Sequence, residues 1–355
     1  MKRVLYSVLL CLSPLIMRAE VPVLPGTVET TVEKKKTIIK LFDVDSKDNL
    51  VVDNQFGQVT IGLWDRPEIK IQITIIANSD SDERTQKYLD AVSIEEKRSG
   101  NQITVRTNFS QSAVSNWSFG KWKDDGERNF VRINYDVMMP KQNALTLKNR
   151  FGNTSIHSFQ APLTVYTRYG NFIAEELASR QNDIDVAYGK ANIRYIDAGK
   201  LDMAYGSLEL VKANDLTLTN KAGKMTIGDV GKLNADINYS GAKIGNLRES
   251  GKIKLSFSGG FRIDQLPKTV ENVDIQASYS SVALPVDRNN DCDFDVTVSY
   301  GSFNYPSNST WHFTAQPDDD NRRGPKLTKQ YVGKVGSGSG TKVRVVSKFG
   351  NVNFQ

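Results

Sequence analysis

Hydrophobic and polar residues alternate along most of the chain, and an aromatic residue followed by glycine breaks the alternation at regular points. In the segment LDMAYGSLEL, apolar residues lie two and four positions before Tyr205 and three and five positions after it. Neighbouring residues of a strand point to opposite faces, so this period of two predicts strands with one buried face. The glycine is expected to take a positive φ and to bring the ring onto the same inward face.

The aromatic position recurs about every 20 residues, which is typical of stacked repeats. It is occupied by Phe56, Phe151, Tyr169, Tyr188, Tyr205, Ala222, Tyr239, Phe257, Tyr279, Tyr300 and Phe349. Between Phe151 and Tyr300 the spacings are 18, 19, 17, 17, 17, 18, 22 and 21 residues. The sequence therefore predicts an all-β fold, a right-handed β-solenoid (single-stranded β-helix) in which each repeat is one coil.

Equivalent side chains of stacked coils lie above one another, so the aromatic residues are expected to form an internal structural ladder. Its members are Phe151, Tyr169, Tyr188, Tyr205, Tyr239, Phe257, Tyr279, Tyr300 and Phe349. Truncating a buried ring such as Tyr205 to alanine would then cost about 3–5 kcal/mol. Asn54, Asn149 and Asn220 occupy inward positions two residues before the aromatic, and their amides are expected to bond to nearby backbone.

The chain divides into three regions. Residues 1–19 are interpreted as a signal peptide, because two cations precede an apolar run that is shorter than the roughly 20 residues of a spanning helix. Residues 20–140 are expected to be a β-rich segment that carries one short helix within DSDERTQKYLDAV and caps the solenoid. Residues 141–355 hold the solenoid repeats with a polar insertion near 316–342, and the last unit, VVSKFGNVNF, is expected to close the C-terminal end.

The distribution of charge argues against a nucleic-acid partner, and the sequence around the two cysteines argues against a lipid anchor or a thiol site. Three of the six excess positive charges lie in the first nineteen residues, and no basic run interleaved with aromatic residues follows, so no nucleic-acid partner is predicted. The residue before Cys11 is leucine, whereas a lipoprotein signal usually has a small residue there, so lipidation is not favoured. Cys292 alternates in phase with Phe294 and Val296 and is expected to be a small buried hydrophobe.

The sequence contains no recognisable catalytic, metal or cofactor motif. His157 and His312 are the only histidines, and neither has a second ligand-type residue at metal spacing. Asp183 and Asp185 form the best local carboxylate pair, but they alternate with apolar residues and are interpreted as a solvated outer strip. We therefore expect no catalytic residue, no metal and no cofactor.

One aromatic stretch does not follow the core pattern. Trp117, Phe119 and Trp122 lie beside charged residues in SNWSFGKWKDDGERNF, in an expected loop. Exposed aromatic residues with flanking charges suit contact with carbohydrate or protein. The alternative is a long hairpin that folds these rings onto the N-terminal segment.

The segments NQFGQVTI and MMPKQNALTLKNRFGNTSI, the repeated YG units and the terminal KFGNVNF resemble the exported β-strand-repeat adhesin family of Bacteroidota. The resemblance covers most of the chain and implies a right-handed β-solenoid outside the cytoplasm. We therefore predict a non-catalytic adhesin-like or scaffold protein of the cell envelope, in the periplasm or at the outer membrane or cell surface, that binds a glycan or an envelope protein.

Two alternatives remain open from the sequence. One is a β-helical carbohydrate-active enzyme, a polysaccharide lyase or hydrolase, which a carboxylate cluster on one outer face would favour. The other is a periplasmic partner in envelope signalling.

Overall fold

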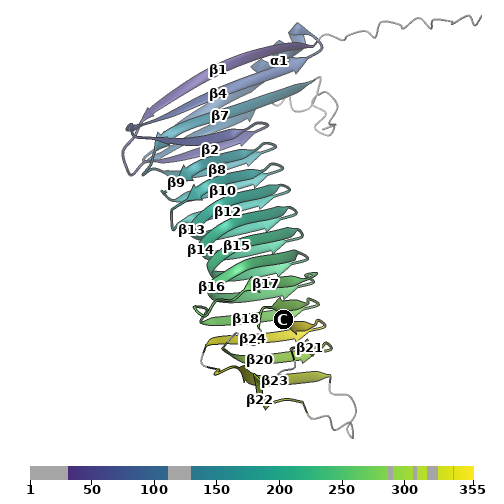
Figure 1. Ribbon diagram of the computed structural model, residues 1–355. Coiled ribbons are helices and arrows are strands. Elements are labelled where there is room, and N and C mark those ends of the chain that lie inside the picture. The colour runs from purple at the N-terminus through teal and green to yellow at the C-terminus, as the bar shows by residue number, and fades with distance from the viewer. Residues whose placement is uncertain (1–30, 111–128, 287–290, 307–309, 318–326, 339) are drawn as a thin grey trace, which may run out of the picture.

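The computed structural model shows a long rod of stacked strands, with a short helix and longer antiparallel strands at one end (Figure 1). The structure describes residues 31–110, 129–286, 291–306, 310–317, 327–338 and 340–355. One helix and 25 strands lie in these ranges, so the expected all-β class is confirmed. The right-handed sense of the coil stays a prediction.

The elements follow one another along the chain in three groups. The N-terminal group is β1 Val32–Asp43, β2 Asn49–Gln55, β3 Val59–Trp64, β4 Glu68–Ser79, α1 Asp82–Asp90, β5 Val92–Ser99, β6 Gln102–Phe109 and β7 Phe130–Pro140. The middle group is β8 Ala144–Arg150, β9 Thr154–Phe159, β10 Leu163–Arg168, β11 Phe172–Leu177, β12 Asn182–Ala187, β13 Lys190–Ala204, β14 Ser207–Lys221, β15 Lys224–Asn238, β16 Gly241–Ser256, β17 Phe261–Gln265, β18 Asn272–Ser278 and β19 Val282–Leu284. The last group is β20 Cys292–Ser299, β21 Phe303–Asn304, β22 Trp311–Ala315, β23 Thr328–Val335, β24 Thr341–Lys348 and β25 Val352–Phe354.

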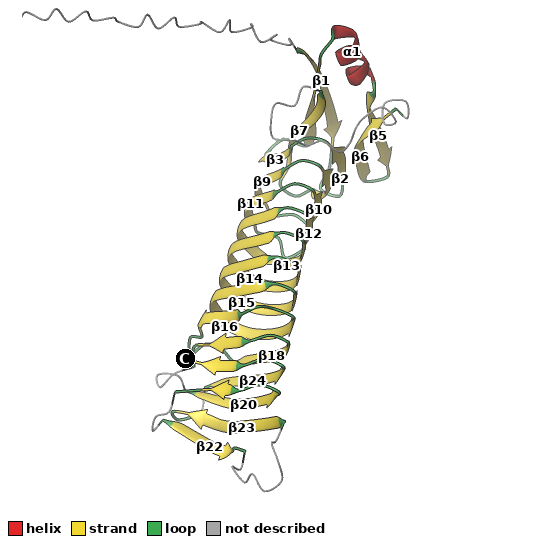
Figure 2. Cartoon of the chain, turned by 90° about the vertical axis from the view of Figure 1, so that its right-hand side faces the viewer, coloured by secondary structure: helices red, strands yellow, loops and turns green. Residues whose placement is uncertain are grey.

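Each coil of the rod has two faces, joined by one sharp corner and one gentle bend. On face A, defined by β8, β10 and β12, strands of successive coils pair in parallel. On face B, defined by β9, β11 and the start of β13, they do the same. The later part of β13 pairs with β12, so one long strand passes from face B to face A of the next coil. Successive turns therefore lie directly on one another as a solenoid (Figure 2).

The core fills the space between faces A and B. Leu201 and Met203 on face A and Leu208 and Leu210 on face B are all buried, as the alternation predicts. One continuous cluster of buried hydrophobic residues runs through the stack. The inward assignment of the apolar positions is therefore confirmed.

Each end of the rod contains a coil that is inserted out of sequence order. Near the N-terminus, β2 lies between β6 and β8, and β3 lies between β7 and β9. Near the C-terminus, β24 lies between β18 and β20, and β25 lies between β19 and β21. The expectation that the last unit closes the C-terminal end is therefore wrong, because that unit fills a space between two earlier coils.

Antiparallel strands flank the solenoid at both ends. β4 pairs with β1 and β7 at one end, and β23 pairs with β20 and β22 at the other. Of these strands, β23 lies within the polar insertion expected near 316–342. The expected helix is confirmed as α1. The Ser81 hydroxyl caps it by accepting a hydrogen bond from the Arg84 amide, and Asp82 and Glu83 lie in its first turn, near the positive end of the helix dipole.

Candidate functional site

The sharp corner of each coil is formed by the recurring aromatic residue in a left-handed backbone conformation. Eleven corner residues have φ between 50° and 62°: Phe56, Phe151, Tyr169, Tyr188, Tyr205, Ala222, Tyr239, Phe257, Tyr279, Tyr300 and Phe349. The expectation that the following glycine takes the positive φ is therefore wrong. For residues other than glycine this conformation costs roughly 1–2 kcal/mol, so the packing of neighbouring coils must hold it in place.

Eight of the eleven corner residues are followed by a glycine, and these glycines are required by the close approach of successive coils. A Cβ atom on Gly206 would lie 1.9 Å from the carbonyl oxygen of Gly189. The same contact recurs along the column from Gly189 to Gly170, from Gly170 to Gly152 and from Gly152 to Gly57, at 1.9–2.0 Å. A side chain on these glycines would push against the neighbouring coil, so glycine allows these corners to stack at strand spacing. At three other corners the position is taken by Ser240, Ser258 and Ser280.

The aromatic rings of the corners stack along the outside of the rod. Centroids of adjacent rings are 4.6–5.1 Å apart and their planes lie within 4–7° of parallel. The expectation of an internal ladder is wrong, because none of its members is buried: Phe151, Tyr169, Tyr188, Tyr205, Tyr239, Phe257, Tyr279, Tyr300 and Phe349. The left-handed φ ends the alternation at the corner, and the ring points to solvent instead of into the core.

A ring that stacks on two neighbouring rings should stabilise the fold more than a ring that stacks on only one. Tyr188 stacks on Tyr169 and Tyr205, whereas Tyr205 is followed by Ala222, which has no ring. Each aromatic pair contributes about 0.5–1.5 kcal/mol. Alanine at Tyr188 should therefore lower the free energy of unfolding by about twice as much as alanine at Tyr205 in urea denaturation. A loss of about 3–5 kcal/mol at both positions, the size expected of a buried ring, would contradict the outer placement.

The ladder has a break at Ala222. This residue keeps the left-handed φ of 53°. Tyr205 and Tyr239 on either side are 59% and 65% exposed, whereas five residues with a ring on both faces are 45–52% exposed: Tyr169, Tyr188, Phe257, Tyr279 and Phe349. One face of Tyr205 and one face of Tyr239 are therefore open to solvent.

A polar hollow on face A adjoins the ladder over the coils of Ala222, Tyr239, Phe257 and Tyr279. It has a volume of about 280 Å³, and its outward-facing lining is Thr217, Thr219, Asn234, Asp236, Lys252, Lys254, Asp274 and Gln276. One carboxylate oxygen of Asp274 is buried and has no hydrogen-bond partner among the described residues. Hydroxyl, amide, carboxylate and ammonium groups thus offer both donors and acceptors along one strip.

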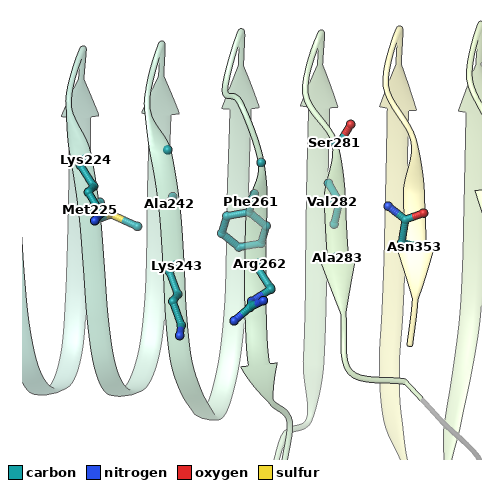
Figure 3. A pocket seen from close by; sticks show the side chains of 12 residues that line it. Lys224, Met225, Ala242, Lys243, Phe261, Arg262, Ser281, Val282, Ala283 and Asn353 are labelled. Atoms are coloured by element: carbon teal, nitrogen blue, oxygen red, sulfur yellow. The ribbon is translucent and has the colours of Figure 1, made fainter.

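A second hollow lies on face B beside the same four coils and the inserted coil of Phe349 (Figure 3). Its volume is about 510 Å³, and it exists because Gly241, Gly260 and Ser281 are small at outward positions. Lys224, Lys243 and Arg262 also line it.

The three cations that line the face-B hollow differ in whether a carboxylate lies close enough to neutralise them. Lys243 Nζ and Arg262 Nε lie 2.9 and 2.7 Å from the carboxylate of Asp264. The hydrogen bond from Lys243 and the charge of Arg262 lower the pKa of that carboxyl. Lys224 has no ion-pair partner in the part of the chain that the structure describes, so its charge is available to a ligand.

Comparison with known proteins returns likenesses to solved structures only. No family model matches the sequence, and no curated protein matches it. A "putative cell adhesion protein" from Clostridium sporogenes is 11% identical, with 90% of this chain and 99% of that chain covered and a TM-score of 0.22. A "putative adhesin" from Bacteroides fragilis is 10% identical, with coverage of 90% and 97% and a TM-score of 0.31. A "putative lipid binding protein" from Parabacteroides distasonis is 9% identical, with coverage of 91% and 96% and a TM-score of 0.35.

Likeness at this level does not establish a family or a function for the present chain. Its membership in the adhesin family therefore stays a prediction. In the described ranges, the single short helix falls well below the length and hydropathy that a membrane-spanning helix requires.

Two of the three inward asparagines bond to nearby backbone, as expected. The amides of Asn54 and Asn149 donate to the carbonyl oxygens of Ile133 and Gly152, both at 3.0 Å. Asn220 is also buried, but its Nδ2 atom has no hydrogen-bond partner among the described residues. Its neighbours on adjacent coils are the apolar Met203 and Ile237, so no second amide helps to orient it.

The candidate binding loop with Trp117, Phe119 and Trp122 lies outside the described residues and stays a prediction. Asp183 is exposed, and Asp185 forms an ion pair with Arg168. The described ranges contain no group of three or more His, Cys, Asp or Glu residues that could hold a metal.

Cys292 is buried, as its place in the strand pattern predicts. Burial, reinforced by the charge of Asp293, raises the pKa of its thiol to about 12. The thiol therefore stays protonated near neutral pH, and a protonated thiol is a poor nucleophile.

Proposed function

We propose that this protein is an exported, non-catalytic, adhesin-like rod of the bacterial cell envelope that binds a glycan across its aromatic corner. The observation that carries the proposal is the position of the two hollows. They share the coils of Ala222, Tyr239, Phe257 and Tyr279, one on each side of the exposed ladder. Rings offer apolar surface to the C–H groups of sugars, and the polar groups of both faces suit sugar hydroxyls.

The shape of this surface favours binding of an extended chain. Both hollows are shallow and run across several coils, so a ligand can contact equivalent side chains on one coil after another. Repeated weak contacts of this kind add up along a chain without any deep pocket.

The enzyme alternative has less support from the face-A hollow. Its carboxylates, Asp236 and Asp274, lie two coils apart, which is roughly 10 Å along the rod. Lys252 and Lys254 lie on the coil between them. Glycosidases place their two carboxylates about 5–9.5 Å apart on either side of the bond they cleave. Release of shortened or unsaturated sugars from a bound glycan would favour the enzyme instead.

The cellular location belongs to the proposal. Residues 1–30, with the expected signal peptide and Cys11, lie outside the described residues. Export to the periplasm or the cell surface is supported by the sequence pattern of residues 1–19. The loop that contains Trp117, Phe119 and Trp122 is proposed as a second contact for the same ligand or for an envelope protein.

Filling the face-A hollow should weaken glycan binding while leaving the fold intact. Thr217 lines the hollow, and Thr164 occupies the same position in the coil of Tyr169, outside it. After a glycan array has identified a ligand, calorimetry should show that Thr217→Phe weakens binding by at least about tenfold. Thr164→Phe should leave the affinity unchanged. If the wild-type protein binds no glycan, or if both variants bind as well as the wild type, the proposal is wrong.

A further inference from the structure

The break in the outer ladder has the dimensions of one missing ring. Ten of the eleven corner residues are aromatic, and the exception is Ala222. The open faces of Tyr205 and Tyr239 look toward each other across this coil. Strands of a sheet lie about 4.8 Å apart, so the two rings are roughly 10 Å apart. One six-membered ring fits between them at the 4.6–5.1 Å spacing that the other rings keep.

Two uncompensated cations lie at the mouth of this slot. Lys221 directly precedes Ala222 and Lys224 follows it by two residues, and both are exposed. Neither has an ion-pair partner among the residues that the structure describes. Their neighbours on adjacent coils are uncharged: Ala204, Asn238, Ser207 and Gly241. Asp202 and Asp236 lie on the coils beside Lys221, but neither forms an ion pair with it. Two ammonium groups that form no ion pair among the described residues favour an anionic ligand.

We propose that the slot at Ala222 is a subsite for one carboxylate-bearing sugar, a uronic-acid residue of an acidic polysaccharide. Its pyranose ring lies between Tyr205 and Tyr239, and its carboxylate contacts Lys221 and Lys224. A pyranose has C–H groups on both faces, so it can stack on two aromatic rings at once. This inference rests on the proposed glycan binding and names the class of sugar at one end of the same surface.

The surroundings of the slot favour a sugar over an aromatic side chain of a protein partner. A phenyl ring would match the slot in thickness but would leave the two lysines without a counter-charge. Thr219 of the face-A hollow and Lys224 of the face-B hollow lie on the coil of Ala222. A polyhydroxylated chain can therefore leave the slot and continue along either hollow with its hydroxyl groups paired.

Calorimetry with two oligosaccharides tests the subsite. The probes are a galacturonic-acid hexamer and the neutral maltohexaose. Ala222→Tyr fills the slot, Ala222→Ser leaves it open as a matched control, and the Lys221→Gln/Lys224→Gln pair removes the charge. We expect Ala222→Tyr to weaken binding of the galacturonate by at least about tenfold and Ala222→Ser to leave it unchanged. The double glutamine variant should weaken binding of the galacturonate but not that of a neutral glycan.

The variants separate loss of the site from loss of the fold. Ala222→Tyr completes the ring stack, so its melting temperature should be no lower than that of the wild type. Wild-type affinity for galacturonate in Ala222→Tyr would overturn the subsite, while the proposed function would stand if Thr217→Phe still weakened glycan binding. Binding of neutral glycans only, or competition at the slot by aromatic peptides alone, would also overturn it. Failure of the wild type to bind any glycan would overturn both proposals.

Discussion

Replacing Gly206 with alanine is expected to lower the free energy of unfolding by about 3 kcal/mol or more. The new Cβ atom would lie 1.9 Å from the carbonyl oxygen of Gly189. The carbonyl oxygen of Gly189 accepts a hydrogen bond from the Ser207 amide at 3.3 Å, and the strands that flank both glycines are paired in parallel. Neither group can therefore move without lengthening hydrogen bonds between two coils. Urea denaturation measures the loss directly.

Gly259 provides the matched control for this substitution. A Cβ atom on Gly259 would have no heavy atom within 4 Å, and the residue does not have a positive φ. Gly259→Ala should therefore change the stability by no more than about 0.5 kcal/mol. Similar losses for the two variants would show that the glycines act through backbone flexibility and not through the close approach of coils.

Deleting residues 341–355 is expected to unfold the end of the rod from β20 onward. This segment forms β24 and β25, which pair on both sides with neighbouring coils. It also buries Val343, Val345, Val352 and Phe354, and full burial of each such side chain contributes about 1.5–3 kcal/mol. Because each coil of a solenoid contacts only its neighbours, the coils before Tyr279 should stay folded. Hydrogen exchange should show lost protection in β20 to β23 alone.

A synthetic peptide of residues 341–355 should restore this protection when it is added to the truncated protein. The same peptide with Val345→Asp should not restore it, because the substitution places a charge in the core. Full protection of β20 to β23 without any peptide would mean that the coils of Tyr279 and Tyr300 close directly onto each other. That result would contradict a required role for the inserted coil.

The repeat and its core were predictable because they depend on side-chain alternation alone. Leu201, Met203, Leu208 and Leu210 follow a period of two and are buried. The direction of the rings was not predictable in this way, because it depends on a left-handed φ at Tyr205 that alternation does not encode. The glycine suggested a special backbone at the corner, but it is required there for its lack of a side chain.

The inserted coils could not be recognised from the sequence pattern, because Phe56 and Phe349 carry the same local pattern as the other corners. Only their distances of 95 residues from Phe151 and 49 residues from Tyr300 set them apart. The break at Ala222 was visible in the sequence, yet its meaning depends on the outward direction of its neighbours. The two hollows depend on which outward residues of neighbouring coils lie side by side. The register between β15 and β16 shifts after Val230, so this pairing does not follow a constant repeat length.

The placement of the aromatic ladder on the surface is tested most directly by nitration of tyrosines in the native protein, followed by mass spectrometry. Tyr135 is the internal reference, because it is fully buried, bonds to the Thr107 hydroxyl at 2.8 Å, and has a pKa that burial raises to about 12. We predict rapid modification of the ladder tyrosines, with Tyr135 modified only after unfolding. Ladder tyrosines as protected as Tyr135 would contradict the outer ladder and the binding surface built on it.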